Sequence, residues 1–106
     1  MVCNYSNTIA IKHGINSALI AGFINYRLTH TDTKFEGRPF VRITQKSLTG
    51  TFPFMGEKAV RNAIKRLVKA NIITVKQFRK SKFDHANFYA LTQYGKTLME
   101  GVEDVE

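Results

Sequence analysis

Basic and amide side chains recur at helical spacing between positions 58 and 69, and they suit contact with a nucleic acid. The set consists of Lys58, Arg61, Asn62, Lys65 and Lys69. Arg61 can form two hydrogen bonds to the O6 and N7 of guanine, and Asn62 can pair in the same two-fold way with adenine. We therefore predict that Arg61 and Asn62 read bases and that the three lysines hold phosphates.

A second group of basic side chains falls in a polar segment, residues 79–86. Its members are Arg79, Lys80, Lys82 and His85. We expect this segment to form a wing between two strands, with its tip along an adjacent minor groove or along the backbone. Upstream, Lys46 and Ser47 are predicted to hold the DNA backbone from the start of another helix, although an ordinary exposed face explains them equally well.

The charge of the chain is concentrated in the same region. The sequence holds 16 Lys and Arg against 8 Asp and Glu, which gives a net charge of +8. No acidic residue lies between Lys58 and Lys82, whereas half of the acids fall in residues 100–106. A run of one sign repels itself and needs counterions, so we expect a polyanionic partner, nucleic acid first and an anionic membrane surface second.

Sequence motifs for catalysis and for metal binding are lacking. His30 and Asp32 share one loop, but His13 and His85 are distant in sequence, so no metal site is predicted. A Gly-x-x-x-x-Gly-Lys phosphate-binding loop is also absent. We expect a protein that is not an enzyme and that needs no cofactor.

Length and cysteine usage restrict the remaining classes. A chain of 106 residues has room for one domain with one core. Cys3 is the lone cysteine, so it cannot form an internal disulfide, which is typical of cytoplasmic proteins. The longest apolar run, Ala18 to Ile24, is far shorter than the ~20 residues of a membrane span. These features predict a soluble cytoplasmic protein without a membrane partner.

The basic face is expected on a helix over residues 56–70. An apolar stripe recurs there at helical intervals, and its members are Val60, Ala63, Ile64, Leu67 and Val68. The basic side chains fall on the opposite face, and a helix of ~22 Å, at about 1.5 Å per residue, fits a major groove. Gly56 is its expected N-cap. Glu57 either complements the helix dipole, which we favour, or accepts a hydrogen bond from cytosine.

The other segments predict an α+β chain around this helix. The expected elements are a buried helix over residues 16–26, a mobile loop over 29–39, a strand over 40–43, a helix over 45–48 or a little beyond, a turn with Gly50, Pro53 and Gly56, strands over 72–78 and 87–91, and a last helix over 93–100. Their order is helix, strand, helix, helix, strand, wing, strand, helix. This order is the plan of a winged helix-turn-helix.

Helix ends are marked by residues that cap or stop a helix. We expect Asn16 or Ser17 to cap the first helix, Thr44 to cap the second and Thr92 to cap the last. Asn71 suits the left-handed stop position after the basic helix.

Aromatic and apolar residues outside the basic helix are divided between core and surface. Phe52 and Phe54 are expected to plug the core, and Tyr94 and Leu98 are expected to face inward from the last helix. Phe83 is the ring expected at the wing tip, where it would stack on unpaired bases. Binding of single strands or RNA therefore stays open as an alternative.

Several stretches carry a resemblance to a known family. They read Phe-Val-Arg-Ile-Thr-Gln-Lys-Ser-Leu at 40–48, Phe-Pro-Phe at 52–54, Glu-Lys-Ala-Val-Arg-Asn-Ala-Ile-Lys-Arg-Leu at 57–67, Ile-Ile at 72–73 and Asp-His-Ala-Asn-Phe-Tyr-Ala-Leu-Thr at 84–92. The chain resembles the winged-helix N-terminal domains of phage, plasmid and mobile-element replication initiators, including DnaD-like replisome organisers. The likeness covers residues 16–92. It implies a DNA-binding domain over residues 1–99, followed by an acidic tail or the start of a linker over 100–106.

The resemblance implies sequence-specific binding of double-stranded DNA at a replication origin. It also implies action as a homodimer or on repeated sites, and contact with replication proteins through a C-terminal region that this sequence lacks. Transcriptional repressors use the same order of elements, so a promoter is an alternative target. A further alternative is a protein-interaction winged helix, such as a phage-borne inhibitor, whose basic face meets an acidic protein surface.

Overall fold

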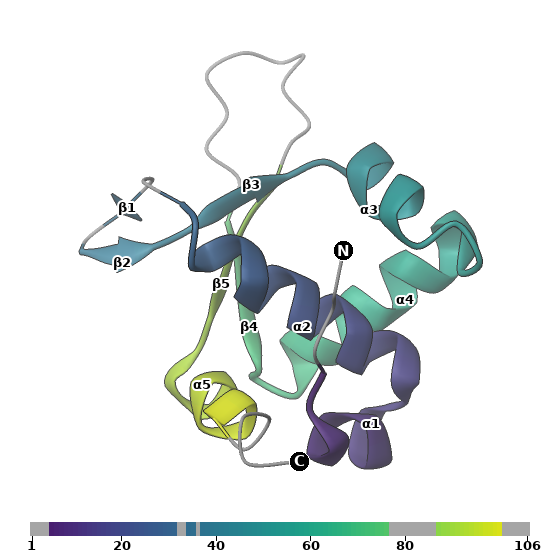
Figure 1. The fold of residues 1–106 in the computed structure, drawn as a ribbon, viewed down its shortest axis with the longest axis horizontal. Helices are drawn as coiled ribbons and strands as arrows, with labels where there is room; N and C mark the ends of the chain where they lie inside the picture. The colour runs from purple at the N-terminus through teal and green to yellow at the C-terminus, as the bar shows by residue number, and fades with distance from the viewer. Residues whose placement is uncertain (1–4, 32–33, 36, 77–86, 101–106) are drawn as a thin grey trace.

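A computed structural model describes residues 5–31, 34–35, 37–76 and 87–100, and within them the chain has an α+β fold (Figure 1). The described helices are α1 (Asn7–His13), α2 (Ile15–Leu28), α3 (Gln45–Thr51), α4 (Gly56–Lys69) and α5 (Gln93–Glu100). The described strands are β1 (Lys34–Phe35), β2 (Arg38–Pro39), β3 (Val41–Ile43), β4 (Ile73–Lys76) and β5 (Asn87–Leu91). Figure 1 shows α3 and α4 together at one end of the molecule, away from β1 and β2.

A small antiparallel sheet places β5 between β3 and β4. Tyr89 of β5 pairs with Val41 on one side and with Val75 on the other. Tyr89 and Leu91 are buried, as expected for a central strand with aromatic and branched residues. The strands expected over 40–43 and 87–91 are confirmed, and the strand expected over 72–78 is confirmed for Ile73–Lys76, after which residues 77 and 78 lie outside the described residues.

Helix α2 forms the centre of the core, as its nearly uniform apolar sequence predicts. Ile20 is fully buried, and the helix packs against α1, α4 and β5. The N-cap is Gly14, with φ of 92°, so the prediction of Asn16 or Ser17 as the cap is wrong. Ser17 is instead buried within the helix, where its hydroxyl donates to the carbonyl oxygen of Ala63 in α4 at 3.4 Å.

Helix α1 precedes the first helix that the sequence predicts. The hydroxyl of Ser6 caps it by accepting a hydrogen bond from the backbone N–H of Ile9 at 3.3 Å. Ile9 is fully buried, whereas Ile11 is 84% exposed. A helix of this length that buries a single isoleucine is too short to show an apolar period in the sequence.

The loop expected over residues 29–39 contains a two-stranded ribbon, so that prediction is wrong in part. Lys34 pairs with Pro39, and the turn between the strands places Gly37 at φ of 77°. At the base of the ribbon, the hydroxyl of Thr31 donates to the carbonyl oxygen of Phe40 at 2.8 Å. Strands of two residues are too short for an alternating pattern, and the polar, glycine-containing sequence therefore reads as a loop.

The two helices that carry the predicted interface begin and end largely as expected. Thr44 caps α3 by accepting a hydrogen bond from the backbone N–H of Ser47 at 3.0 Å, which confirms that cap. Helix α4 confirms the long amphipathic helix, with Val60 and Leu67 buried, but Val68 of the expected apolar stripe is 44% exposed. Asn71 follows it at φ of 62°, which confirms the left-handed stop.

The turn between α3 and α4 departs from the prediction. Phe52 is 4% exposed and belongs to the core, whereas Phe54 is 70% exposed, so the core position expected for Phe54 is wrong. Gly50 lies within α3 and not in the turn. Gly56 has φ of 75°, and the N-cap of α4 is Met55, which makes no side-chain hydrogen bond, so the assignment of the cap to Gly56 is wrong.

Helix α5 begins at the cap that the sequence predicts but turns a different face inward. The hydroxyl of Thr92 accepts a hydrogen bond from the backbone N–H of Gly95 at 2.9 Å. Met99 is buried and Leu98 packs against the core, whereas Tyr94 is 42% exposed. The expectation for Leu98 is therefore confirmed, and the inward placement of Tyr94 is wrong.

Candidate nucleic-acid interface

One face of α4 carries all of the side chains that the sequence predicts on this helix. We call this the α4 face, and its members are Lys58, Arg61, Asn62, Lys65 and Lys69, each of them exposed. Burial of the opposite side of the helix against the core leaves this row open to solvent. Within the part of the chain that the structure describes, no ion pair engages the cations of the α4 face.

Neighbouring helices hold α4 in position. The buried hydroxyl of Ser17 ties α2 to the carbonyl oxygen of Ala63. From α3, the side-chain amide of Gln45 donates to the carbonyl oxygen of Glu57 at 3.3 Å, at the start of α4. Helix α4 is thus hydrogen-bonded to both α2 and α3.

The start of α4 is positive in backbone polarity and has no side-chain cap. Its first-turn N–H groups are unbonded within the helix, as at any helix start. Glu57 is exposed in this first turn, where a carboxylate is favourable beside the positive end of the helix dipole. This location is consistent with the dipole interpretation of Glu57.

Helix α3 places its two predicted contact residues unequally. Lys46 is exposed, whereas Ser47 is half-buried. The backbone of Ser47 is occupied, because its N–H donates to Thr44 and its carbonyl oxygen accepts from the hydroxyl of Thr51 at 2.9 Å. Lys46 is thus the more accessible of the two for a phosphate.

The predicted wing lies outside the described residues. This holds for Arg79, Lys80 and Lys82, and also for Phe83 and His85. The strands on either side of this segment, β4 and β5, are paired neighbours in the sheet.

The ends of these strands near the predicted wing carry a further cation. At the end of β4, Lys76 is paired with Phe88, and its ammonium lies 5.7 Å from the ring centre of Phe40. Lys76 belongs to the basic run in the sequence, and the strand register places it in the last residue pair of β4 and β5 before residue 77.

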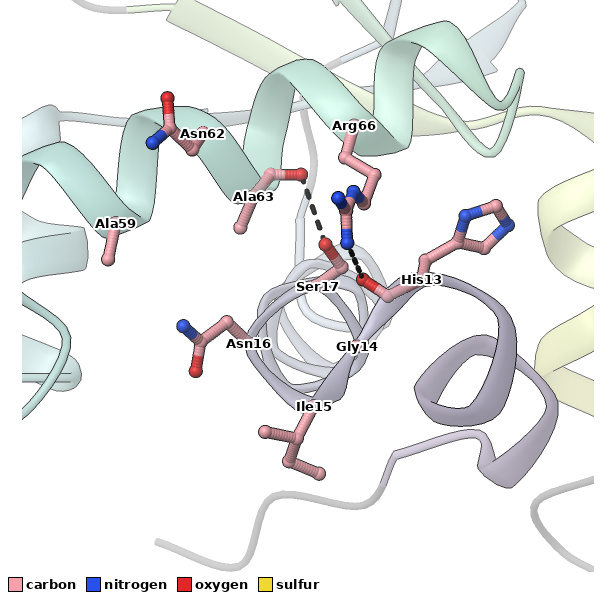
Figure 2. A pocket seen from close by; sticks show the side chains of 9 residues that line it. All are labelled: His13, Gly14, Ile15, Asn16, Ser17, Ala59, Asn62, Ala63 and Arg66. Carbon is pink, nitrogen blue, oxygen red and sulfur yellow. Dashed lines mark hydrogen bonds between the residues drawn. The ribbon is translucent and has the colours of Figure 1, made fainter.

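A hollow of about 440 Å³ adjoins the α4 face (Figure 2). Its lining residues come from the end of α1, the start of α2 and α4, and they are His13, Gly14, Ile15, Asn16, Ser17, Ala59, Asn62, Ala63 and Arg66. Arg66 donates a hydrogen bond from Nη1 to the carbonyl oxygen of His13 at 3.1 Å. Asn62 therefore stands at the edge of the α4 face, between the exposed lysines and the hollow.

Sequence reasoning assigned no role to Arg66, although it belongs to the basic run. Arg66 is exposed and lies on the side of α4 that faces the start of α2. With Asn16 and Asn62 it makes a polar, cationic border to the hollow (Figure 2). The helical spacing of Asn62 and Arg66 is evident in the sequence, but the packing of the start of α2 against this side of α4 is not.

The sheet holds one buried phenol close to the predicted wing. Burial raises the pKa of Tyr89 above 10.0, while the hydrogen bond from the Asn87 side chain acts in the lowering direction. The side-chain N–H of Asn87 donates to the Tyr89 hydroxyl at 3.5 Å, and Asn87 Oδ1 is buried without a hydrogen-bond partner among the described residues. Tyr89 therefore stays neutral at physiological pH and serves the packing of the sheet.

The described part of the chain shows neither a metal-binding group nor a membrane-spanning helix. Residues 5–31, 34–35, 37–76 and 87–100 hold no group of three or more His, Cys, Asp or Glu that is able to bind a metal ion. No helix within those ranges has the length and apolar character needed to cross a membrane. Comparisons of the whole chain with protein-family models, with curated proteins and with solved structures give no match.

Proposed function

We propose that the chain is a winged helix-turn-helix domain that binds double-stranded DNA in a sequence-specific manner, with α4 as the recognition helix. The observation that carries this proposal is the α4 face, a row of exposed cations and one amide on a helix whose other side is buried. A row of exposed basic side chains along a helix is typical of nucleic-acid-binding proteins. The major groove of double-stranded DNA is wide enough to admit such a helix.

The order of elements supports this fold. Helices α2, α3 and α4 and strands β3, β4 and β5 follow one another as α2, β3, α3, α4, β4, β5, and the sheet order is β3-β5-β4. A winged helix uses this succession, with the wing between its last two strands. Residues 77–86 occupy the corresponding position in this sequence.

The residues of the interface divide into base-reading and phosphate-binding side chains. Arg61 and Asn62 are proposed to read bases, because guanidinium and amide groups match the edges of guanine and adenine. Proposed phosphate ligands, which set affinity and register, are Lys46, Ser47, Lys58, Lys65, Lys69, Arg79, Lys80 and Lys82.

The biological setting is proposed from the resemblance to replication initiators of phages, plasmids and mobile elements. The target is then a replication origin, bound by two copies of the chain or at repeated sites. A repressor would use the same interface at a promoter, so the genomic position of the target site separates the two roles.

The decisive experiment is selection of preferred sites from random DNA duplexes, followed by binding measurements at about 150 mM salt, where specific complexes persist. Arg61→Lys keeps the positive charge but removes the guanidinium group that can donate two hydrogen bonds to one guanine. We expect it to weaken binding to the selected site by about fivefold or more, as loss of ~1–3 kcal/mol of base discrimination implies. Binding to a random duplex should stay unchanged.

Two results would contradict the proposal. The first is binding that is equal for every duplex and disappears with salt, which would reduce the α4 face to a general electrostatic surface. The second is the absence of DNA binding at low salt, which would favour an acidic protein as the partner.

A further inference from the structure

Phe54 is an exposed aromatic side chain in the segment between α3 and α4. It is 70% exposed, although the sequence suggested a core position. It lies in the turn between α3 and α4 beside exposed Pro53, and the first two residues of α4, Gly56 and Glu57, are exposed as well. The exposed tyrosines Tyr5, Tyr26 and Tyr94 are 40–46% exposed, so the ring of Phe54 leaves a larger fraction of its surface free to contact a partner.

The ring of Phe54 is held in place by a row of aromatic contacts. It meets Phe52 edge to face, with ring centres 6.3 Å apart at an angle of 87°. Phe52 in turn meets Phe23 of α2 edge to face at 5.8 Å. The backbone of the turn is fixed by a hydrogen bond from the N–H of Met55 to the carbonyl oxygen of Phe52 at 3.0 Å. A ring positioned in this way loses little conformational entropy when it binds.

The place of the ring relative to α4 indicates what it meets. Phe54 immediately precedes the first turn of α4, and Lys58 begins the α4 face one turn later. In helix-turn-helix proteins the start of the recognition helix contacts base edges in the major groove. The apolar group that DNA presents there is the C5-methyl of thymine, and phenylalanine is among the side chains that pack on it.

We propose that Phe54 is a specificity-determining residue that packs on a thymine C5-methyl group in the major groove. This inference rests on the proposed function, because it requires α4 to lie in that groove. It adds a reader of A·T pairs to the polar readers Arg61 and Asn62, and it assigns that role to the turn before the helix.

The test starts from a DNA site selected by the unaltered protein. Each thymine of the site is replaced in turn by deoxyuridine, which removes only the methyl group. We expect one or two positions at which the loss of the methyl weakens binding about fourfold, the effect of one buried methylene-sized group. Phe54→Ala should bind the thymine and uracil duplexes with equal, reduced affinity.

Tyr94→Ala is the matched control, because Tyr94 is an exposed ring on α5. This variant should keep the preference for thymine. A specific site that is insensitive to uracil, or a preference that Phe54→Ala retains, would overturn this inference and leave the proposed DNA binding intact. Failure of the unaltered protein to select any site would overturn both.

Discussion

At the scale of single residues, Gly95 determines how α5 lies on the sheet. A Cβ atom at this position would overlap the backbone carbonyl of Ile72, which directly precedes β4. Because this approach is possible only for glycine, the side of α5 that includes Gly95 and Met99 faces the core, and Tyr94 faces outward. Helical periodicity alone assigns Tyr94 to the buried side of α5. It contains no information on the close approach of the Gly95 backbone to Ile72.

Gly95→Ala should therefore destabilise the domain. We expect a fall of about 1–3 kcal/mol in the free energy of unfolding, the usual range for an overpacked core, measured by urea denaturation. Gly50→Ala is the control, because Gly50 lies within α3 with open space around its Cα. That change should raise the free energy of unfolding by up to about 1 kcal/mol. Equal effects of the two alanines would show that Gly95 is not a contact position.

At the scale of elements, local sequence was sufficient to predict the starts of α3 and α5, which a threonine caps, but not those of α2 and α4, which have no side-chain cap. Thr44 and Thr92 each accept a hydrogen bond from the backbone N–H three residues later. These caps act within one turn of chain, so their residue types were sufficient to predict them. Helix α1 and the β1–β2 ribbon were missed because neither is long enough to repeat a pattern, and their stability comes from contacts such as buried Ile9.

Removal of the cap of α3 should weaken the element that supports the start of α4. Thr44→Ala is expected to lower the free energy of unfolding by about 1 kcal/mol, because the N–H of Ser47 loses its acceptor. Thr97→Ala is the matched change, since Thr97 is exposed on α5 and its hydroxyl donates only to the carbonyl oxygen of Gln93. The second variant should be neutral or slightly more stable, as alanine favours a helix interior. A neutral Thr44→Ala in urea denaturation would contradict the role of this cap.

At the scale of the whole molecule, the sequence was sufficient to predict the exposed composition of the α4 face but not its surroundings. The apolar stripe around Val60 fixed which side of α4 is buried, and the cations followed by geometry. The hollow beside Arg66 and the exposure of Phe54 depend on how α2 and the α3–α4 turn meet the helix. Such positions arise from contacts between distant segments, which no local period encodes.

The proposed interface also implies that the position of a charge, and not the net charge of the molecule, controls DNA binding. Lys65→Ala and Lys96→Ala each remove one positive charge from a chain of net charge +8. Lys65 lies on the α4 face, whereas Lys96 is exposed on α5. If Lys65 neutralises a phosphate, its loss should weaken specific and random duplexes alike and reduce the slope of log affinity against log salt by about 1. Lys96→Ala should leave that slope unchanged, and equal slopes for the two variants would mean that the whole positive field, without a defined contact at Lys65, attracts the DNA.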